Sequence, residues 1–301
     1  MNDRSFSLDS FLEGVRARNL YVLSLAVHSQ GEEIASWQAN DTPRQVFSVS
    51  KSLASLGIGF ALQEGLLSLS DRLCELVPPE HGMAPGSEEI RLGDVLIMAT
   101  GHRQSDADTA MQRAYEGADW ADTFYAMPVV TRPGTHFDYD TLATYMLGCA
   151  VQKTSGQTLH QYLMPRLFEP LGMAPGWDTC PAGRTQAGVG LQLTVREMAR
   201  IGQFLLDEGR VGGRQLLDPG YIREAKQVHI RTDDCHLDKK LGYGYQFWRC
   251  AWVDSYRASG MHGQFIIVME REHAVIAVQS METQNAQGIL SLIWETLAPQ
   301  L

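Results

Sequence analysis

The sequence lacks the features that mark several large classes of protein. It has no cluster of basic residues, and its formal net charge of −10 disfavours binding to nucleic acid or to an anionic membrane. No apolar run reaches the length of a membrane-spanning helix, and the N-terminal segment has no apolar core typical of a signal peptide. We therefore expect a cytoplasmic protein with neither a nucleic-acid nor a membrane partner.

Cysteine is also scarce. The five cysteines are an odd number at scattered spacings, and none forms a Cys-x-x-Cys pair, so we expect reduced and mostly buried thiols. There is no internal repeat and no low-complexity tract. With 301 residues, 44% of them hydrophobic, the chain is long enough for one large globular domain or two smaller ones.

Three zones of different character follow one another along the chain. The first predicts a short helix, the two strands of a β-hairpin and a buried helix, at 10–19, 20–28, 33–37 and 48–65. In the second, proline and glycine interrupt repeatedly and strand signals are few, with helical candidates at 92–98, 119–126, 142–153 and 159–168. The third predicts a capped helix, three strands and a closing helix, at 194–209, 244–253, 265–270, 274–280 and 285–297.

Strands at both ends and helices in the middle indicate a sheet assembled from distant pieces of sequence. We predict an α+β fold in which an antiparallel β-sheet is flanked by N- and C-terminal helices and carries a mainly helical inserted subdomain. The chain then forms one domain over 1–301, in which 1–70 and 185–301 build the sheet part and 71–184 build the insertion.

A hydroxyl and an amine stand three residues apart at the start of the predicted buried helix, as Ser48 and Lys51. This spacing puts both side chains on one helix face, about one turn apart. A serine needs an adjacent base to act as a nucleophile at neutral pH, and burial can turn a lysine into that base. The helix start also leaves backbone N–H groups available to a developing negative charge. The alternative is an ordinary helix start with a solvated Lys51.

Two further patterns accompany this pair. The segment 133–141 is a turn that presents Tyr139 immediately before a predicted helix. The segment 258–264, Ala-Ser-Gly-Met-His-Gly-Gln, ends one strand and begins the next near the C-terminus.

With these three patterns in this order, the sequence resembles the serine β-lactamase and penicillin-binding-protein superfamily, on the branch of class C β-lactamases, family VIII esterases and 6-aminohexanoate-dimer hydrolases. The resemblance covers nearly the whole chain and includes 190–202 and 260–264, which are similar to stretches of the esterase and dimer-hydrolase branch. It implies a β-lactamase/transpeptidase-like fold, with Ser48 as nucleophile, Lys51 as its partner and Tyr139 as general base and acid. It implies neither a cofactor nor a metal.

The resemblance also implies how a substrate is held. The oxyanion hole would consist of the backbone N–H groups of Ser48 and Met261. Candidates for substrate contact are four residues of the second and third patterns: Thr141, Ser259, Gly260 and His262. For His262, packing or a loop hydrogen bond is an equally good interpretation.

Two departures from the family pattern bear on the substrate. Ala258 stands where lactamases carry the lysine of Lys-Thr-Gly, which helps to bind the carboxylate of a β-lactam. Thr141 stands where an asparagine amide contacts substrate. We therefore do not expect efficient β-lactamase activity.

These residues lead to a mechanistic hypothesis. Tyr139, brought to lose its proton by the Lys51 ammonium, takes the proton of Ser48 as Ser48 attacks a carbonyl, and water later hydrolyses the acyl-Ser48 ester. We predict a serine hydrolase that cleaves a small ester or amide and is esterase-like rather than an efficient β-lactamase. One alternative is an amide-specific hydrolase of the D-aminopeptidase or oligoamide type, favoured if Asp138 or Asp140 faces the pocket. Another is a catalytically silent relative that binds a ligand.

Three other groups of residues invite a functional interpretation. A cluster of zinc-binding residue types is better explained as an exposed polar loop: His229, Asp233, Asp234, Cys235 and His236. Three aromatic residues line either an acyl pocket or the core: Trp120, Tyr125 and Trp248. Asp138 and Asp140 flank Tyr139, and we expect at least one of them to cap a helix. Substrate identity and oligomeric state do not follow from the sequence.

Overall fold

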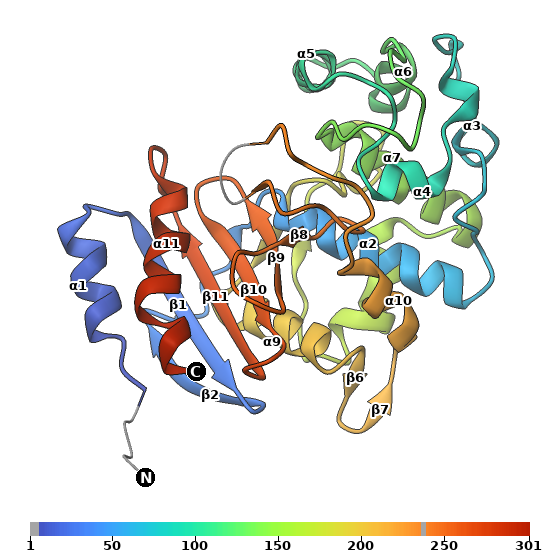
Figure 1. Cartoon of the computed structure of the whole chain (residues 1–301). Helices are drawn as coiled ribbons and strands as arrows, with labels where there is room; N and C mark the ends of the chain where they lie inside the picture. The colour runs from blue at the N-terminus through green and yellow to red at the C-terminus, as the bar shows by residue number, and fades with distance from the viewer. Residues whose placement is uncertain (1–5, 236–238) are drawn as a thin grey trace.

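A six-stranded antiparallel sheet forms the centre of the computed structural model, which describes residues 6–235 and 239–301 (Figure 1). Its strand order is β2-β1-β11-β10-β9-β8, so the N-terminal hairpin pairs directly with the last strand of the chain. The strands are β1 (Val22–Ser29), β2 (Glu32–Trp37), β8 (Trp248–Arg249), β9 (Ser255–Gly260), β10 (Gln264–Met269) and β11 (Ala274–Ser280).

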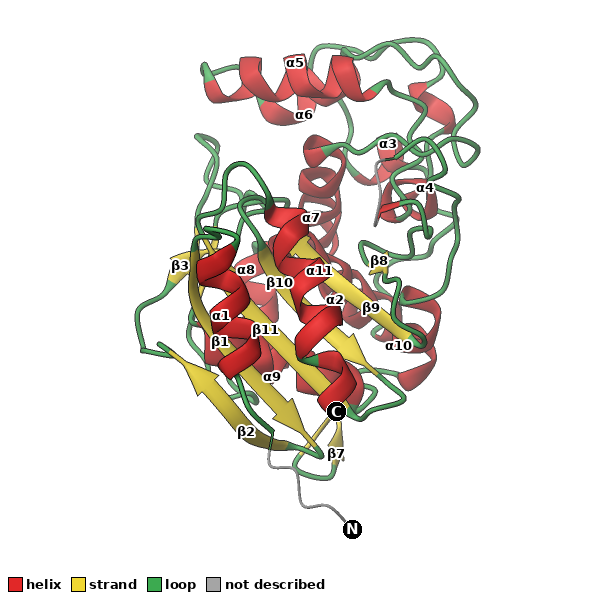
Figure 2. Ribbon diagram, turned by 60° about the vertical axis from the view of Figure 1, so that its left-hand side comes forward, coloured by secondary structure: helices red, strands yellow, loops and turns green. Residues whose placement is uncertain are grey.

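Helices cover both faces of this sheet. The terminal helices α1 (Asp9–Ala17) and α11 (Ala286–Thr296) lie on one face, in front of the strands in Figure 2. The other face packs on α9 (Val195–Leu206) and, at β9, on α2 (Val49–Gln63). Alternate residues of each strand therefore belong to different cores: Phe265 and Ile267 of β10 face the terminal helices, whereas Ile266 and Val268 face the other way.

The middle of the chain is mainly helical. Its elements are α3 (Leu73–Leu76), α4 (Leu92–Leu96), α5 (Gln104–Tyr115), α6 (Trp120–Tyr125), α7 (Thr141–Ser155) and α8 (Leu159–Leu163), after which 164–168 forms a π-helical turn. A three-stranded sheet joins β3 (Arg44–Gln45), β5 (Leu191–Leu193) and β4 (Gly176–Trp177). A small hairpin, β6 (Arg210–Val211) and β7 (Arg214–Gln215), precedes α10 (Pro219–Ala225). Helices α2 and α7 pack against each other where the two parts of the molecule meet.

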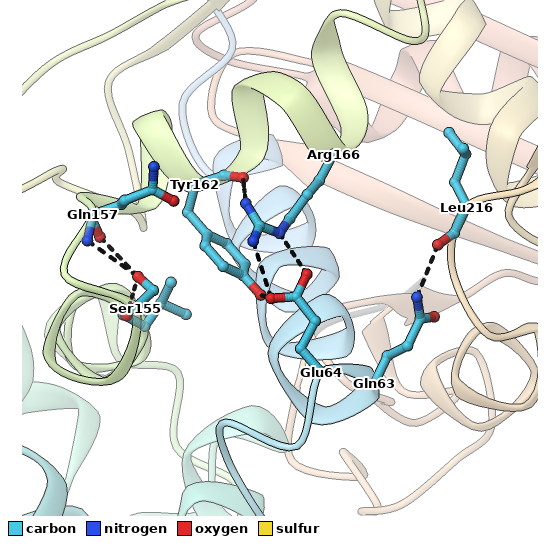
Figure 3. A network of polar contacts seen from close by, with 8 residues as sticks. Gln63, Glu64, Ser155, Gln157, Tyr162, Arg166 and Leu216 are labelled. Carbon is cyan, nitrogen blue, oxygen red and sulfur yellow. Dashed lines mark hydrogen bonds and ion pairs between the residues drawn. The ribbon is translucent and has the colours of Figure 1, made fainter.

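The C-terminal end of α2 is fixed by a polar network (Figure 3). Arg166 donates to both carboxylate oxygens of Glu64, at 2.6 and 3.0 Å, and the hydroxyl of Tyr162 donates to the same carboxylate at 2.9 Å. The Arg166 guanidinium also lies 3.8 Å from the centre of the Tyr162 ring. Helix α8 and the turn after it therefore clamp the last turn of α2 through a bidentate ion pair.

The structure confirms the α+β class, the antiparallel sheet and its covering helices. No helix among residues 6–235 and 239–301 has the length and apolar character required to cross a membrane. The N-terminal hairpin turns at Gln30 and Gly31, both with positive φ, as the sequence indicates.

The predicted strand 244–253 is wrong in most of its length. Only Trp248 and Arg249 pair with the sheet, and the strand beside β10 is β9, at 255–260. The cause is Gln246, which has φ +65 and donates its side-chain amide to the carbonyl oxygen of Leu96, thereby turning the chain towards the helical part. The sequence analysis also does not predict helix α5.

Candidate active site

Ser48 is the N-cap residue of α2, at the end of a tight turn. Phe47 before it has φ +48, in the left-handed region that a non-glycine residue adopts at a cost of about 1–3 kcal/mol. The turn is held by Ser50, whose hydroxyl donates to the carbonyl oxygen of Phe47 at 2.6 Å and accepts from the amide of Leu191 at 3.3 Å. Strand β5 thus fixes the backbone that carries Ser48.

Lys51 lies one turn further along α2 and is 1% exposed. Its Nζ is 2.9 Å from Ser48 Oγ, 3.1 Å from Thr141 Oγ1 and 2.9 Å from the carbonyl oxygen of Gly188. The ammonium form donates to all three oxygens. The neutral amine can donate to Gly188 and Thr141 and keep its lone pair for the hydroxyl proton of Ser48.

Burial determines the protonation of this amine. Loss of hydration lowers the pKa of Lys51 from its ordinary value of 10.5 to about 7, and the nearby Lys239 lowers it as well. The carboxylate of Asp140 acts in the opposite direction. A substantial fraction of Lys51 is therefore neutral at physiological pH, which is the form that can accept a proton.

Tyr139 completes the group from the turn before α7. Its ring centre is 5.0 Å from Lys51 Nζ, and the ring stacks on Trp248 with 5.8 Å between centroids. Burial raises the pKa of Tyr139 to about 12, and a hydrogen bond with Ser48 offsets part of that rise. The phenol is therefore protonated across the physiological range.

The turn between β9 and β10 lies directly against the start of α2. A Cβ on Gly260 would collide with the carbonyl oxygen of Val46 and come within 3.3 Å of the Ser48 amide nitrogen, so only glycine allows this approach. Met261 follows immediately and is 62% exposed. His262 has φ +63 and packs edge-on against Phe47, with 5.1 Å between ring centroids.

Two pockets open on either side of Ser48 and share Ser48 and Met261 in their walls. We name the first, of about 380 Å³, the tyrosine lobe; its lining includes Tyr139, Lys239, Trp248, Ser259, Gly260, His262 and Leu290. We name the second, of about 570 Å³, the α5 lobe; its lining includes Phe47, Ala107, Asp108, Met111, Tyr115, Glu116, Thr141 and Val189. Tyr139 belongs to the first lining and not to the second.

One cleft brings together Ser48, the buried amine of Lys51 and the protonated phenol of Tyr139. The end of β9 lies beside them, against the start of α2. A model of the beta-lactamase family matches residues 10–289. The chain belongs to the beta-lactamase family. The protein is therefore a hydrolase of that family.

Individual proteins are similar to this chain in sequence or in fold. The 6-aminohexanoate-dimer hydrolase of Paenarthrobacter ureafaciens is 25% identical over 281 residues, which are 84% of this chain and 71% of the relative. Among solved structures, a putative 6-aminohexanoate-dimer hydrolase from Bacillus anthracis has a TM-score of 0.78 at 19% identity, covering 93% of this chain and 79% of that one. EstCE1, described as a hydrolase with promiscuous acyltransferase activity, has a TM-score of 0.76 at 14% identity, covering 95% and 99%.

The remaining candidates of this beta-lactamase-family site divide between the two lobes. Ser259, Gly260 and His262 line the tyrosine lobe, and Thr141 lines the α5 lobe. Thr141 is also bonded to Lys51, so it orients the amine as well as bordering the pocket. The carbonyl oxygen of His262 accepts from the amide of Glu282, which supports the loop interpretation alongside its place in the lobe.

The two aspartates beside Tyr139 serve the backbone. Asp140 is the N-cap of α7 and accepts from the amide of Leu142 at 2.8 Å. Asp138 accepts from the amide of Gln104 at 3.0 Å, at the first residue of α5. Neither aspartate lines either lobe, so the condition that favoured the amide-specific alternative is not met.

The three aromatic candidates separate in the same way. Trp120 and Tyr125 are buried in the core of the helical part, and neither lines a lobe. Trp248 lies between Tyr139 and Lys239 in the wall of the tyrosine lobe.

The residues of zinc-binding type at 229–235, for which we preferred an exposed polar loop, do not form a ligand set among the residues that the structure describes. His229 stacks on Tyr245 and bonds a backbone carbonyl, and Asp233 pairs with Arg231. His236 lies outside the described residues. Within 6–235 and 239–301, the three-residue group with metal-ligand spacing is instead Glu80, His81 and Asp122, at the surface; there Asp122 accepts from the backbone amides of the other two.

Sequence reasoning missed three contributors. Gly188 supplies a carbonyl acceptor to Lys51, Gln246 ties α2, α4 and α7 together, and Lys239 enters the tyrosine lobe. Each comes from a loop far from Ser48 in the sequence. The positive φ of Gln246 leaves no local signal, whereas the Gly188-Val189-Gly190 run does indicate a turn.

Proposed function

We propose that the protein is a serine hydrolase that cleaves a small ester or amide through a covalent acyl-Ser48 intermediate. The observation that carries this proposal is the contact between Ser48 and Lys51, a buried amine 2.9 Å from a hydroxyl at a helix N-terminus. Burying a lysine costs hydration free energy, so a lysine is rarely retained in the core for packing alone. A buried amine held by three oxygens is instead suited to act as a base.

Lys51 is the better candidate for the base that activates Ser48. Its lowered pKa of about 7 makes the neutral amine available, whereas the raised pKa of about 12 keeps Tyr139 protonated. This reverses the role that the sequence-based hypothesis gave to Tyr139. The Ser48 proton passes to Lys51 Nζ as the bond from Ser48 Oγ to the substrate carbonyl carbon forms.

Tyr139 then acts as the acid. As the tetrahedral intermediate collapses, the bond to the leaving group breaks and the leaving heteroatom takes the phenolic proton, which the Lys51 ammonium replaces. The oxyanion is held by the backbone N–H groups of Ser48 and Met261, on the wall common to both lobes. In the second half, water attacks the acyl carbon and gives a proton to Lys51 Nζ; the bond from the acyl carbon to Ser48 Oγ then breaks, and Lys51 returns the proton to Ser48 Oγ.

The two lobes indicate where the leaving group and the acyl group of the substrate bind. Because Tyr139 lines the tyrosine lobe alone, the group that receives its proton lies there, and the acyl group lies in the α5 lobe. The α5 lobe is walled mainly by apolar side chains such as Met111, Tyr115 and Val189, which suits an alkyl or aryl acyl group.

The similarity to a 6-aminohexanoate-dimer hydrolase keeps amide cleavage as the second candidate. Amide cleavage requires a proton for the departing amine, and Tyr139 is in place to provide one. A catalytically silent binder is less well supported, because Ser48, Lys51 and Tyr139 are all present and lie in contact, as catalysis requires.

Intact mass after incubation with a fluorophosphonate tests the proposal. We expect one adduct on the wild type and none on Ser48→Ala, with p-nitrophenyl acetate hydrolysis lost in parallel. Ser70→Ala is the control, because Ser70 is an exposed serine that lines neither lobe, and this variant should label like the wild type. Labelling that persists in a folded Ser48→Ala variant would contradict the assignment; no labelling of the folded wild type would favour the silent binder.

A further inference from the structure

The loop between α4 and α5 lies against the turn that carries Tyr139. The sulfur of Met98 in this loop accepts from the backbone amide of Asp140 at 3.4 Å. Gly101 then reverses the chain: it has φ +90, and a Cβ at this position would collide with a backbone carbonyl oxygen, so only glycine fits. The next residue, His102, is fully buried. The loop thus brings an imidazole beside the start of α7.

His102 and Asp140 form a buried pair. His102 Nδ1 lies 3.6 Å from Asp140 Oδ2, and neither residue is more than 1% exposed. The other carboxylate oxygen, Oδ1, accepts from the amide of Leu142 and thereby caps α7. Within 6–235 and 239–301, Oδ2 has no hydrogen-bond partner, and neither has His102 Nε2. Buried polar atoms are normally hydrogen-bonded, so the capping of α7 does not account for the whole carboxylate.

Two contacts fix the orientation of the imidazole. His102 Nδ1 lies 3.2 Å from the hydroxyl oxygen of Thr100, two residues earlier in the same loop. The edge of the ring packs against Phe124 of α6, with 4.8 Å between ring centroids. The ring therefore keeps Nδ1, the nitrogen nearest to Asp140, on the side of the carboxylate.

The charge of Asp140 acts on the amine at the start of α2. Burial lowers the pKa of Lys51, the Asp140 carboxylate raises it, and Lys239 lowers it. Tyr139 also faces the amine, as a phenol whose pKa burial raises to about 12. On the other side, burial raises the pKa of Asp108 of α5, and the Asp140 carboxylate raises it further. Asp140 thus opposes the loss of the Lys51 proton.

We propose that the buried pair of His102 and Asp140 sets the proton affinity of Lys51. Asp140 is a positioning residue whose charge keeps the amine basic enough to take a proton from Ser48, and His102 holds that carboxylate. Asp140 directly precedes Thr141, whose hydroxyl accepts from Lys51 Nζ at 3.1 Å, so the charge is anchored close to the amine. The proposal rests on the proposed function where it treats Lys51 as the base.

Fluorophosphonate labelling as a function of pH tests the role of Asp140. Asp140→Asn removes the charge and keeps an oxygen that can cap α7, because asparagine is as good an N-cap as aspartate. The midpoint of the rise in labelling rate should move down by about one pH unit, as expected when a nearby opposite charge is lost. Below the wild-type midpoint, this variant should label faster than wild type, which the loss of a purely structural residue would not cause.

Asp138→Asn is the matched control. It makes the same change of charge on the other side of Tyr139, and Asp138 likewise accepts from a backbone amide, that of Gln104. Its midpoint should equal that of the wild type. Equal midpoints in Asp140→Asn and Asp138→Asn would overturn the proposal.

Removing the imidazole tests whether His102 acts through Asp140. His102→Phe keeps a buried ring but removes both nitrogens, which disfavours the charged carboxylate, so the midpoint should fall by less than in Asp140→Asn. In the Asp140→Asn background, the same change should leave the midpoint unaltered, because the charge is already absent. His102→Asn, whose amide can replace the Nδ1 group, should keep the wild-type midpoint. Equal shifts in both backgrounds, or no shift in either, would overturn the role of His102.

Nuclear magnetic resonance separates this proposal from the catalytic one. In protein labelled with carbon-13 at the lysine Cε, a Lys51→Met variant assigns the Lys51 signal, whose chemical shift follows the protonation of Nζ. The midpoint of this titration should be lower in Asp140→Asn than in wild type, even if neither protein reacts with the fluorophosphonate and the proposed function fails. The same Lys51 midpoint in both proteins would contradict the role of the pair, whatever the rate of labelling.

Discussion

The surroundings at one end of α2 stabilise a charged side chain, whereas those at the other end disfavour one. At the C-terminal end, Glu64 meets Arg166 in a partly exposed ion pair; hydrogen bonding to Arg166 lowers the pKa of Glu64 and stabilises its charged form (Figure 3). At the N-terminal end, burial lowers the pKa of Lys51 and thereby disfavours its charged form. The ion pair at the stabilising end keeps both of its charges at neutral pH. The lysine proposed to perform chemistry loses its charge more readily than an ordinary lysine.

The same contrast extends to the backbone. The last turn of α2 ends with Glu64 in ordinary right-handed geometry, and its amide donates within the helix. The first turn follows Phe47 at φ +48 and is held by a long-range contact with Leu191, the first residue of β5. Strain and desolvation are concentrated at the end that carries Ser48, as is common at functional sites.

Replacing Lys51 should have the largest effect. Lys51→Met removes the proposed base, and we expect the rate of ester hydrolysis to fall about 10²–10⁴-fold. The buried amine also binds fewer protons in the folded than in the unfolded chain between about pH 7 and its ordinary pKa of 10.5, so its unfavourable contribution to stability is greatest below pH 7. The stability of the variant relative to wild type should therefore decrease as the pH rises from 7 to 10.5, as measured by denaturant unfolding.

Tyr139→Phe should have a smaller effect that depends on the leaving group. A p-nitrophenolate leaves without a proton, so its ester should lose little, whereas an alkyl ester or an amide should lose about 10²-fold. Steady-state kinetics on both kinds of substrate measures the difference. Equal losses on both would return the role of base to Tyr139.

Arg166→Met should act on stability alone. Removing the cation from the far end of α2 breaks a bidentate pair that is partly exposed, and we expect a loss of about 1 kcal/mol in the free energy of unfolding. That loss should be fully present above pH 4.5, the ordinary value of Glu64, and disappear as the pH falls below 4.5 through the lowered pKa of the folded state, because protonation of the carboxylate removes the ion pair from the wild type. Hydrolysis by the folded variant should match wild type; a large drop in kcat would mean that the two ends of α2 are coupled.

Much of this site could be predicted because its signals are local. Ser48 and Lys51 are one helical turn apart, and Tyr139 directly precedes the N-cap of α7. The sheet could be predicted for a similar reason, since β10 and β11 are continuous apolar runs joined by a short charged turn.

The remainder depends on contacts between distant segments. The buried side of α5 consists of Ala107, Ala110 and Ala114, so the helix has no strong apolar stripe. Strand β9 contains a buried Arg257 and ends in Gly260, neither of which is a strand signal. Lys239 lies in a polar loop whose sequence resembles any solvated surface, and its place beside Trp248 depends on the tertiary fold.

The N-terminal end of α2 holds an amine, Lys51, that we propose is neutral when it acts. The most direct test is the rate of fluorophosphonate labelling of wild-type Ser48 as a function of pH, with intact mass as the readout. If the neutral form of Lys51 is the base, the rate rises about tenfold per pH unit below pH 7 and is level from about pH 8 to pH 10. A rate that is independent of pH between 5 and 9, or that falls above pH 7, would contradict the account.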